Sequence, residues 1–134
     1  MSFLAIHGKS RYPGLNAWTR DGFKIQVKVP KGCLLIQAGQ QAEYVTGGYI
    51  LAGFHEVVVG DNTLKAIQDR KDSGSKRPNW RISSTLFSHI ASDAILKPLK
   101  PWATEEVNQK YPAIHSGDQV MNELNAIKLS RKTN

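Results

Sequence analysis

The sequence contains a single cysteine, Cys33, and no apolar stretch long enough to cross a membrane. One cysteine excludes a disulfide within the chain, which is typical of proteins from a reducing compartment. A membrane-spanning helix needs about 20 consecutive apolar residues, and no segment approaches that length. The first residues, Met1 to Ile6, also lack the basic region and cleavage site of a signal peptide. We therefore expect a cytoplasmic protein with no membrane partner.

The patterns of several common catalytic sites are also missing. The sequence has no glycine-rich phosphate loop, and no combination of Ser, His and an acid indicates a catalytic triad. His7, His89 and His115 show no metal-ligand spacing to one another or to Cys33. The candidates for chemistry that remain lie in strand-like segments near the middle of the chain.

The composition is that of one globular domain with a basic balance of charge. The chain has 134 residues, of which 40% are apolar and 22% charged, enough to form its own hydrophobic core. Its net charge of +7 would favour acidic small molecules, anionic lipid or nucleic acid as partners. The Lys and Arg residues are spread widely, however, and local pairs such as Arg70-Lys71 and Lys76-Arg77 are typical of solvated surface.

Hydrophobic periodicity predicts a mainly β fold, a sandwich or barrel with helical decoration. Apolar and polar residues alternate through 23–29, as in a half-buried strand, and the apolar run that begins at Cys33 predicts a strand buried on both faces, with an inert thiol. In the expected C-terminal helix, Val120, Met121, Leu124 and Ile127 form a stripe that should pack on the sheet. The remaining expected elements are strands at 3–6, 15–19, 49–52, 54–59 and 80–89, a helical turn at 39–45, and helices at 61–72 and 118–130.

Three polar residues in these segments are candidates for binding. His55 lies in the expected strand 54–59, where it is either a metal ligand or a core histidine satisfied by hydrogen bonds. Arg81 and Ser83 are two residues apart, so on a strand both side chains would point to one face. An Arg fork beside a hydroxyl is a good receptor for a carboxylate. The alternative for Arg81 is a structural ion pair with a carboxylate of the chain, since a half-buried cation needs an anionic partner.

A succession of short blocks resembles the C-terminal half of iron(II)- and 2-oxoglutarate-dependent dioxygenases, and most closely their isopenicillin-N-synthase-like branch. The resemblance covers roughly residues 3–99, and the order and spacing of the blocks make it fairly specific. The blocks are residues 14–18 (GLNAW), 29–39 (VPKGCLLIQAG), 46–49 (TGGY), 54–58 (FHEVV) and 80–83 (WRIS).

This resemblance implies a partial double-stranded β-helix, that is, a jelly-roll or cupin-like core. Residues 1–99 would form the core and residues 100–134 a helical extension of the same domain. Family members hold iron with two His and one carboxylate, and bind 2-oxoglutarate as co-substrate. By position in the resemblance, His55 is the distal iron ligand, while Arg81 and Ser83 bind the far carboxylate of 2-oxoglutarate. The implied cofactors are therefore Fe(II) and 2-oxoglutarate.

The sequence departs from the family at the first iron-binding pair, His-x-Asp, which should precede the strand at Phe3 to Ile6. The nearest similar triplet, His7-Gly8-Lys9, has Lys in place of the carboxylate. A single neutral imidazole is a weak iron site because several ligands together give affinity and geometry. We therefore expect an incomplete metal site and no activity from this chain unless a partner supplies the other ligands. Unpaired strand edges would also favour a homo-oligomer.

Two alternatives stay open at this level. The chain could be a non-catalytic, dioxygenase-like module that binds a small acid or a protein. It could instead be a basic, nucleic-acid-binding β domain in which Tyr12, Trp18 or Trp102 stacks on bases, although aromatic and basic residues do not interleave along any one strand. Lys9 and Arg11 form a basic loop that is either solvated or in contact with an acidic substrate.

Overall fold

The computed structural model describes residues 1–127, which form two compact units. The first unit comprises Met1–Ala5, Gln37–Ala52 and the chain from Phe87 onward. The second unit comprises Ile6–Ile36 and Gly53–Leu86. The architecture is mainly β with small helices, built on short strands, and in this respect the predicted fold class is confirmed.

One three-stranded sheet has the order β4-β1-β6, with β1 (Leu4–Gly8) between β4 (Leu34–Ala38) and β6 (Thr85–Ser88). The boundary between the two units passes through each of these strands. Near the start of β1, Phe3 N donates to Ser88 O at 2.8 Å and Gly39 N donates to Phe3 O at 2.8 Å. A Cβ at Gly39 would lie 2.0 Å from Ser2 O, so only glycine allows this close approach of two backbones.

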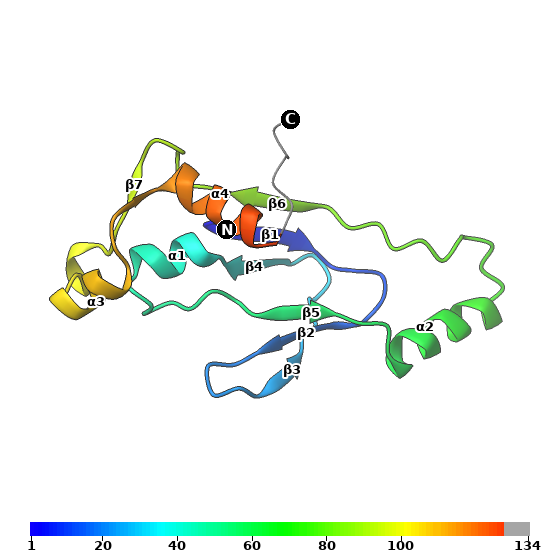
Figure 1. Ribbon diagram of the computed structural model, residues 1–134. Helices are drawn as coiled ribbons and strands as arrows, with labels where there is room; N and C mark the ends of the chain where they lie inside the picture. Colours follow the sequence, from blue (N-terminus) through cyan, green and yellow to red (C-terminus); the bar gives the residue numbers. More distant parts are fainter. Residues whose placement is uncertain (128–134) are drawn as a thin grey trace. The chain divides into compact units, whose positions relative to one another are not determined.

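The sheet of the second unit has β2 (Leu15–Trp18) at its centre, with β3 (Lys24–Gln26) and β5 (His55–Val57) paired antiparallel on its two sides (Figure 1). Ala17 is opposite Ile25 on one side and His55 on the other. Side chains reinforce this register, since Lys24 Nζ lies 2.5 Å from Glu56 Oε1. The hairpin β2–β3 is thus fixed against β5.

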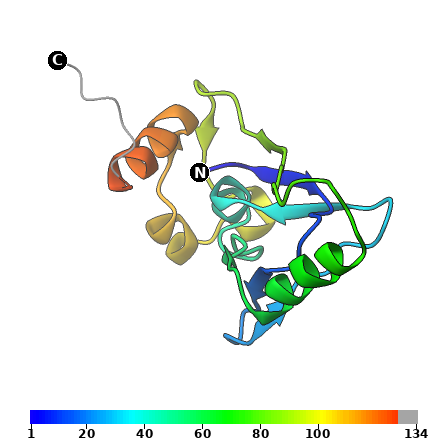
Figure 2. The same ribbon diagram turned by 90° about the vertical axis from the view of Figure 1, so that its right-hand side faces the viewer.

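Helix α2 (Asp61–Asp72) follows β5 and has the bounds that the sequence predicts (Figure 2). Its first turn is anchored because the buried Thr63 donates from Oγ1 to Pro13 O at 3.0 Å. Its last turn is anchored through Arg70, whose Nη1 donates to Tyr12 Oη at 2.7 Å. Tyr12 Oη in turn donates to Asn79 Oδ1 at 3.3 Å. These bonds tie α2 and the polar loop after it to the segment that follows β1.

The first unit is held together by a buried polar network around Gln41 of α1 (Gln40–Val45). Gln41 is 0% exposed, and its Nε2 donates to Ser116 Oγ at 2.9 Å while its Oε1 accepts from Ile90 N at 2.9 Å. Ser116 Oγ completes the network by donating to Ile90 O at 3.0 Å. The other elements of this unit are β7 (Ile95–Leu96), the 3-10 helix η1 (Lys100–Trp102), α3 (Glu105–Lys110), β8 (Ile114–His115) and α4 (Ser116–Ala126).

Several predicted strands are shorter than expected or do not form. Residues 49–52 are irregular, and in the expected strand 80–89 only Thr85–Ser88 pairs. The expected strands at 23–29 and 54–59 shorten to β3 and β5. A strand is assigned from its ladder, and the ladders with β2 extend only over Lys24–Gln26 in β3 and His55–Val57 in β5. The end of the predicted C-terminal helix, beyond residue 127, lies outside the described residues.

The burial predictions were wrong in three places. The strand β4 is not buried on both faces, since Leu34 and Ile36 are exposed, and Cys33 is exposed too. In α4, Val120 and Leu124 are half-buried, but Met121 and Ile127 are exposed. In the expected strand 80–89, Arg81 is exposed rather than half-buried. An apolar run indicates that a residue can be buried, whereas burial itself requires a partner surface.

Large apolar side chains remain exposed in the second unit, including Ile82 at 87%, Val59 at 75% and Trp80 at 72%. The buried apolar residues of the described chain are few and mostly small or aromatic: Ala5, Tyr12, Ala42, Leu96 and Tyr111. None of the helices found in residues 1–127 combines the length and apolar character that crossing a bilayer requires.

Candidate functional site

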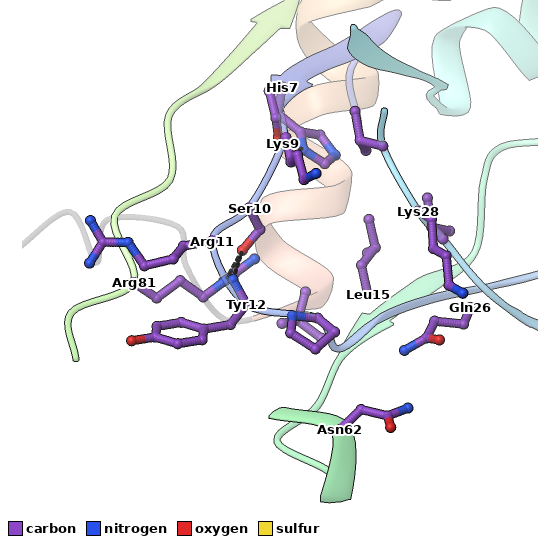
Figure 3. A pocket seen from close by; sticks show the side chains of 15 residues that line it. His7, Lys9, Ser10, Arg11, Tyr12, Leu15, Gln26, Lys28, Asn62 and Arg81 are labelled. Atoms are coloured by element: carbon purple, nitrogen blue, oxygen red, sulfur yellow. Dashed lines mark hydrogen bonds between the residues drawn. The ribbon is translucent and has the colours of Figure 1, made fainter. Parts of the chain in front are cut away.

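A cavity of about 440 Å³ lies in the second unit, between the end of β1 with the loop after it and the chain from Gln26 to Val29 at the end of β3 (Figure 3). Its volume is within the range of small-molecule sites, roughly 300–1,000 Å³. We call it the basic pocket. Its lining residues are His7, Gly8, Lys9, Ser10, Arg11, Tyr12, Pro13, Leu15, Gln26, Val27, Lys28, Val29, Val57, Asn62 and Arg81.

Positively charged side chains dominate the charge of this pocket. Lys9, Arg11, Lys28 and Arg81 line it together with His7, and no Asp or Glu is among the lining residues. Like charges around a cavity repel one another and raise the local potential, so an anion entering the cavity relieves that repulsion. The pocket is therefore suited to an anionic ligand.

Arg81 contributes its guanidinium to the pocket from the irregular segment before β6. Its Nε donates to Ser10 Oγ at 3.2 Å, the bond drawn in Figure 3. Its two Nη groups make no hydrogen bond within residues 1–127, and no carboxylate there pairs with it. The structural ion pair considered as an alternative is thus not found among these residues. The geometry leaves one edge of the Arg fork available for a ligand.

Hydrogen bonds hold the loop that carries Lys9 and Arg11. Tyr12 N donates to Ser10 Oγ at 3.3 Å, and Arg11 Nη1 donates to Pro78 O at 3.4 Å. Tyr12 itself is buried and bonded to Arg70 and Asn79. Sequence reasoning missed Tyr12 as the anchor of this loop, because its partners are distant in sequence.

Lys28 is a second residue that sequence reasoning missed. It follows β3 and lies across the pocket from Arg81 (Figure 3). The backbone fixes this wall, since Val27 N donates to Leu15 O at 2.9 Å. The alternating pattern of 23–29 had placed Lys28 on the polar side of the strand. The pocket lining includes both polar and apolar residues from Gln26 to Val29, which the alternating pattern alone does not predict.

The other two predicted site residues are not brought into this pocket. Ser83 is exposed, does not line the pocket and makes no hydrogen bond within residues 1–127. His55 is exposed on the edge strand β5, with Nδ1 3.2 Å from Gly53 O. Because residues 80–84 form no strand, the expected common face of Arg81 and Ser83 does not arise from a ladder.

The donor set for iron is incomplete in the described part of the chain. No group of three or more His, Cys, Asp or Glu side chains that could hold a metal ion occurs within residues 1–127. His55 therefore belongs to no group of three ligands among these residues, and fewer ligands give neither the affinity nor the geometry of an iron site. The residues present fit an anion in the basic pocket but do not by themselves fit iron.

The fold is similar to that of solved oxygenase structures. A protein from Caulobacter crescentus, assigned to the 2OG-Fe(II) oxygenase family, matches 95% of this chain with a TM-score of 0.73 and 25% sequence identity. A protein from Shewanella oneidensis, assigned as an oxygenase, matches 97% of this chain with a TM-score of 0.66 and 18% identity. A Neurospora crassa protein, solved with alpha-KG and 5-formyluracil, matches 93% with a TM-score of 0.71 and 17% identity.

These matches cover only part of each neighbour. The chain spans 38% of the Caulobacter protein, 39% of the Shewanella protein and 37% of the Neurospora protein. No protein-family model matches the sequence, and no curated protein matches it. Fold similarity over nearly the whole chain, with one neighbour at 25% identity, supports an oxygenase-like ancestry. The chain therefore has a 2OG oxygenase-like fold over a little more than a third of such a protein's length.

Proposed function

We propose that this chain is the C-terminal part of a 2-oxoglutarate- and iron(II)-dependent dioxygenase of the isopenicillin-N-synthase-like branch. Residues 1–99 would belong to its double-stranded β-helix core and residues 100–134 to a helical extension of that domain. The sequence blocks that resemble this family and the oxygenase-like fold both support this assignment. One neighbour was solved with alpha-KG, and this supports the proposal of a 2-oxoglutarate site.

In this proposal, Arg81 binds the far carboxylate of 2-oxoglutarate. The observation that carries it is that Arg81 lines a basic pocket without a carboxylate partner within residues 1–127. A fork held through Nε by Ser10 keeps its Nη groups available for two parallel hydrogen bonds to a carboxylate. Ser83 is assigned the second contact by the sequence resemblance, and it would have to approach the pocket on binding.

His55 is assigned as the distal iron ligand by the same resemblance. Iron, when bound, would chelate 2-oxoglutarate and supply the oxidative chemistry. Two further ligands are needed in addition to His55, and the described residues do not supply the complete set. We therefore assign to this chain the anchoring of the co-substrate carboxylate, while the remaining iron ligands would come from outside the described residues.

Calorimetric titration of 2-oxoglutarate into the chain tests this function. Arg81→Lys should weaken binding by about tenfold or more, because Lys keeps the charge but cannot form two parallel hydrogen bonds. Arg77→Lys is the matched control, since Arg77 is exposed on the preceding loop and does not line the pocket. Equal affinities of the Arg81→Lys variant and the wild type would refute the assignment of Arg81.

An anaerobic titration with Fe(II) separates the enzyme from its alternative. A metal-to-co-substrate absorption band that is absent in His55→Ala would place iron on His55 and favour an assembled oxygenase. Binding of 2-oxoglutarate without that band would favour the second candidate, a non-catalytic module that binds a small acid. The incomplete set of iron ligands within residues 1–127 is the observation that favours this second candidate.

A nucleic-acid-binding role has less support. The three aromatic residues considered for stacking on bases are occupied within the protein. Tyr12 is buried, the Trp18 ring lies 5.0 Å from that of Phe54, and the Trp102 ring lies 5.7 Å from that of Tyr49. Bases would have to displace these partners.

A further inference from the structure

The basic pocket holds more positive charge than one carboxylate would use. The proposed function assigns Arg81 to 2-oxoglutarate, which leaves Lys9, Arg11 and Lys28 on the same cavity. Arg11 is partly engaged, because its Nη1 donates to Pro78 O at 3.4 Å. The ammonium groups of Lys9 and Lys28 make no hydrogen bond or ion pair within residues 1–127. These two lysines are therefore available to a ligand.

The contrast between Lys24, which belongs to β3, and Lys28, which follows β3, supports this reading. Lys24 Nζ lies 2.5 Å from Glu56 Oε1 and 5.4 Å from the centre of the Trp18 ring, so its charge is neutralised within the fold. Lys28 is exposed to solvent and lines the pocket, and no carboxylate lines that cavity. A structural role explains Lys24, whereas the fold provides no counter-charge for Lys28 in the described residues.

Lys28 and Arg81 lie on different sides of the basic pocket. Figure 3 shows Arg11 and Arg81 on one side of the pocket and Lys28 with Gln26 on the other. Lys9 extends into the same cavity near His7. The cavity, about 440 Å³ in volume, has room for more than a single small carboxylate. The charge is therefore distributed over two walls.

We propose that Lys28, with Lys9, forms a second oxyanion subsite in the basic pocket, opposite Arg81. Its ligand is a carboxylate or phosphate group carried by the substrate that is oxidised. This inference rests on the proposed function for the assignment of Arg81 to the co-substrate. The subsite itself depends only on the pocket and its two unpaired lysines.

The subsite can be tested with two simple probes, pyrophosphate and malonate, titrated into the full chain with saturating 2-oxoglutarate. Lys28→Gln should weaken binding of the better probe by about three- to tenfold, because one charge-assisted contact is lost. Lys31→Gln is the matched control, since it removes the same charge from an exposed residue that does not line the pocket. Whichever probe binds more tightly identifies the class of oxyanion.

Other outcomes would overturn the proposal. If neither probe binds, or if Lys28→Gln and Lys31→Gln bind the better probe equally, there is no second subsite at Lys28. If Lys28→Gln weakens binding of 2-oxoglutarate itself as strongly as Arg81→Lys does, Lys28 serves the co-substrate and the assignment is wrong. Lys9→Gln provides a second variant should Lys28→Gln fail to fold.

The same titrations separate this inference from the proposed function. Loss of probe binding in Lys28→Gln, without any binding of 2-oxoglutarate to the wild type, would retain the oxyanion subsite and refute the co-substrate site. Arg81-dependent binding of 2-oxoglutarate without binding of either probe would retain the co-substrate site and refute the oxyanion subsite.

Discussion

Gly14 allows two backbone segments of the second unit to approach each other closely. Its φ is +130°, and a Cβ at this position would lie 2.2 Å from Val58 O. Gly14 O also accepts a hydrogen bond from Val58 N at 2.9 Å. The residue thus joins the basic loop to the chain that leaves β5, at a distance that no side chain permits.

We predict that Gly14→Ala destabilises the protein by about 1–3 kcal/mol or more, since it combines an unfavourable φ with a backbone clash. Urea denaturation followed by circular dichroism measures the change in the free energy of unfolding. Gly8→Ala is the control, because a Cβ at Gly8 would meet nothing within 4 Å. Similar midpoints for the two variants would contradict this prediction.

Among the elements, α1 is connected to distant parts of the first unit through Glu43. Glu43 Oε2 accepts from Ala52 N at 2.9 Å, and Glu43 Oε1 accepts from Tyr111 Oη at 3.0 Å. Tyr111, which directly follows α3, is only 8% exposed. Burial, the hydrogen bond to Glu43 and the negative charge of Glu43 all raise the pKa of the Tyr111 hydroxyl above 10.

This pKa shift predicts a loss of stability at high pH. A group whose pKa is higher in the folded state binds its proton more tightly there, so folding is favoured fully at pH values below its unfolded pKa, near 10. The contribution is then lost as the pH rises through the raised pKa of the folded state. We expect the free energy of unfolding to fall more steeply above pH 10 for the wild type than for Tyr111→Phe.

Chemical denaturation at a series of pH values between about 8 and 11 provides the measurement. The Tyr44→Phe variant is a useful comparison, because burial also raises the pKa of Tyr44 but no carboxylate contributes. Parallel pH profiles for the wild type and Tyr111→Phe would show that the Tyr111 hydroxyl is not linked to folding.

The helices and strands differ in how far the sequence alone predicts them. Helix α2 has the predicted bounds, because its periodicity and its polar ends are local signals. The expected strand 80–89 is reduced to residues 85–88, since a ladder depends on a partner that local sequence does not specify. The same reason explains the exposed Leu34 and Ile36 in β4.

The candidate site was also predicted only in part from the sequence. The resemblance to a family pointed to Arg81, and the structure places Arg81 in a basic pocket. Lys28 was not predicted as a site residue because its place in the pocket depends on how the chain after β3 lies relative to the basic loop, which the local sequence does not specify. Assignments of Ser83 and His55 stay predictions, since neither lines the pocket.

For the molecule as a whole, the exposed apolar surface is the main physical consequence of this fold. Phe23, Ile82 and Val59 are each more than 70% exposed in the second unit, and β3 and β5 are the edge strands of its sheet. Burying apolar surface yields roughly 25 cal/mol per Å², and unpaired edges can add hydrogen bonds. Both effects favour association with another chain.

We predict that the chain self-associates reversibly and that Ile82→Ser weakens this association by several-fold, since Ile82 is 87% exposed and would be buried in a contact. Sedimentation velocity over a wide range of concentrations measures the effect. Lys31→Gln serves as a control that changes an exposed polar residue of the same unit. A sedimentation coefficient that does not depend on concentration in the wild type would exclude self-association.

The exposed position of Cys33 makes the protein convenient for labelling. It is the single cysteine of the sequence, it precedes β4, and it belongs to the same unit as the basic pocket. A thiol-reactive fluorophore would therefore attach at one known position, without modifying the Lys and Arg side chains that line the pocket. Its emission, followed during titrations, would provide an optical signal of ligand entry that is independent of heat and of turnover.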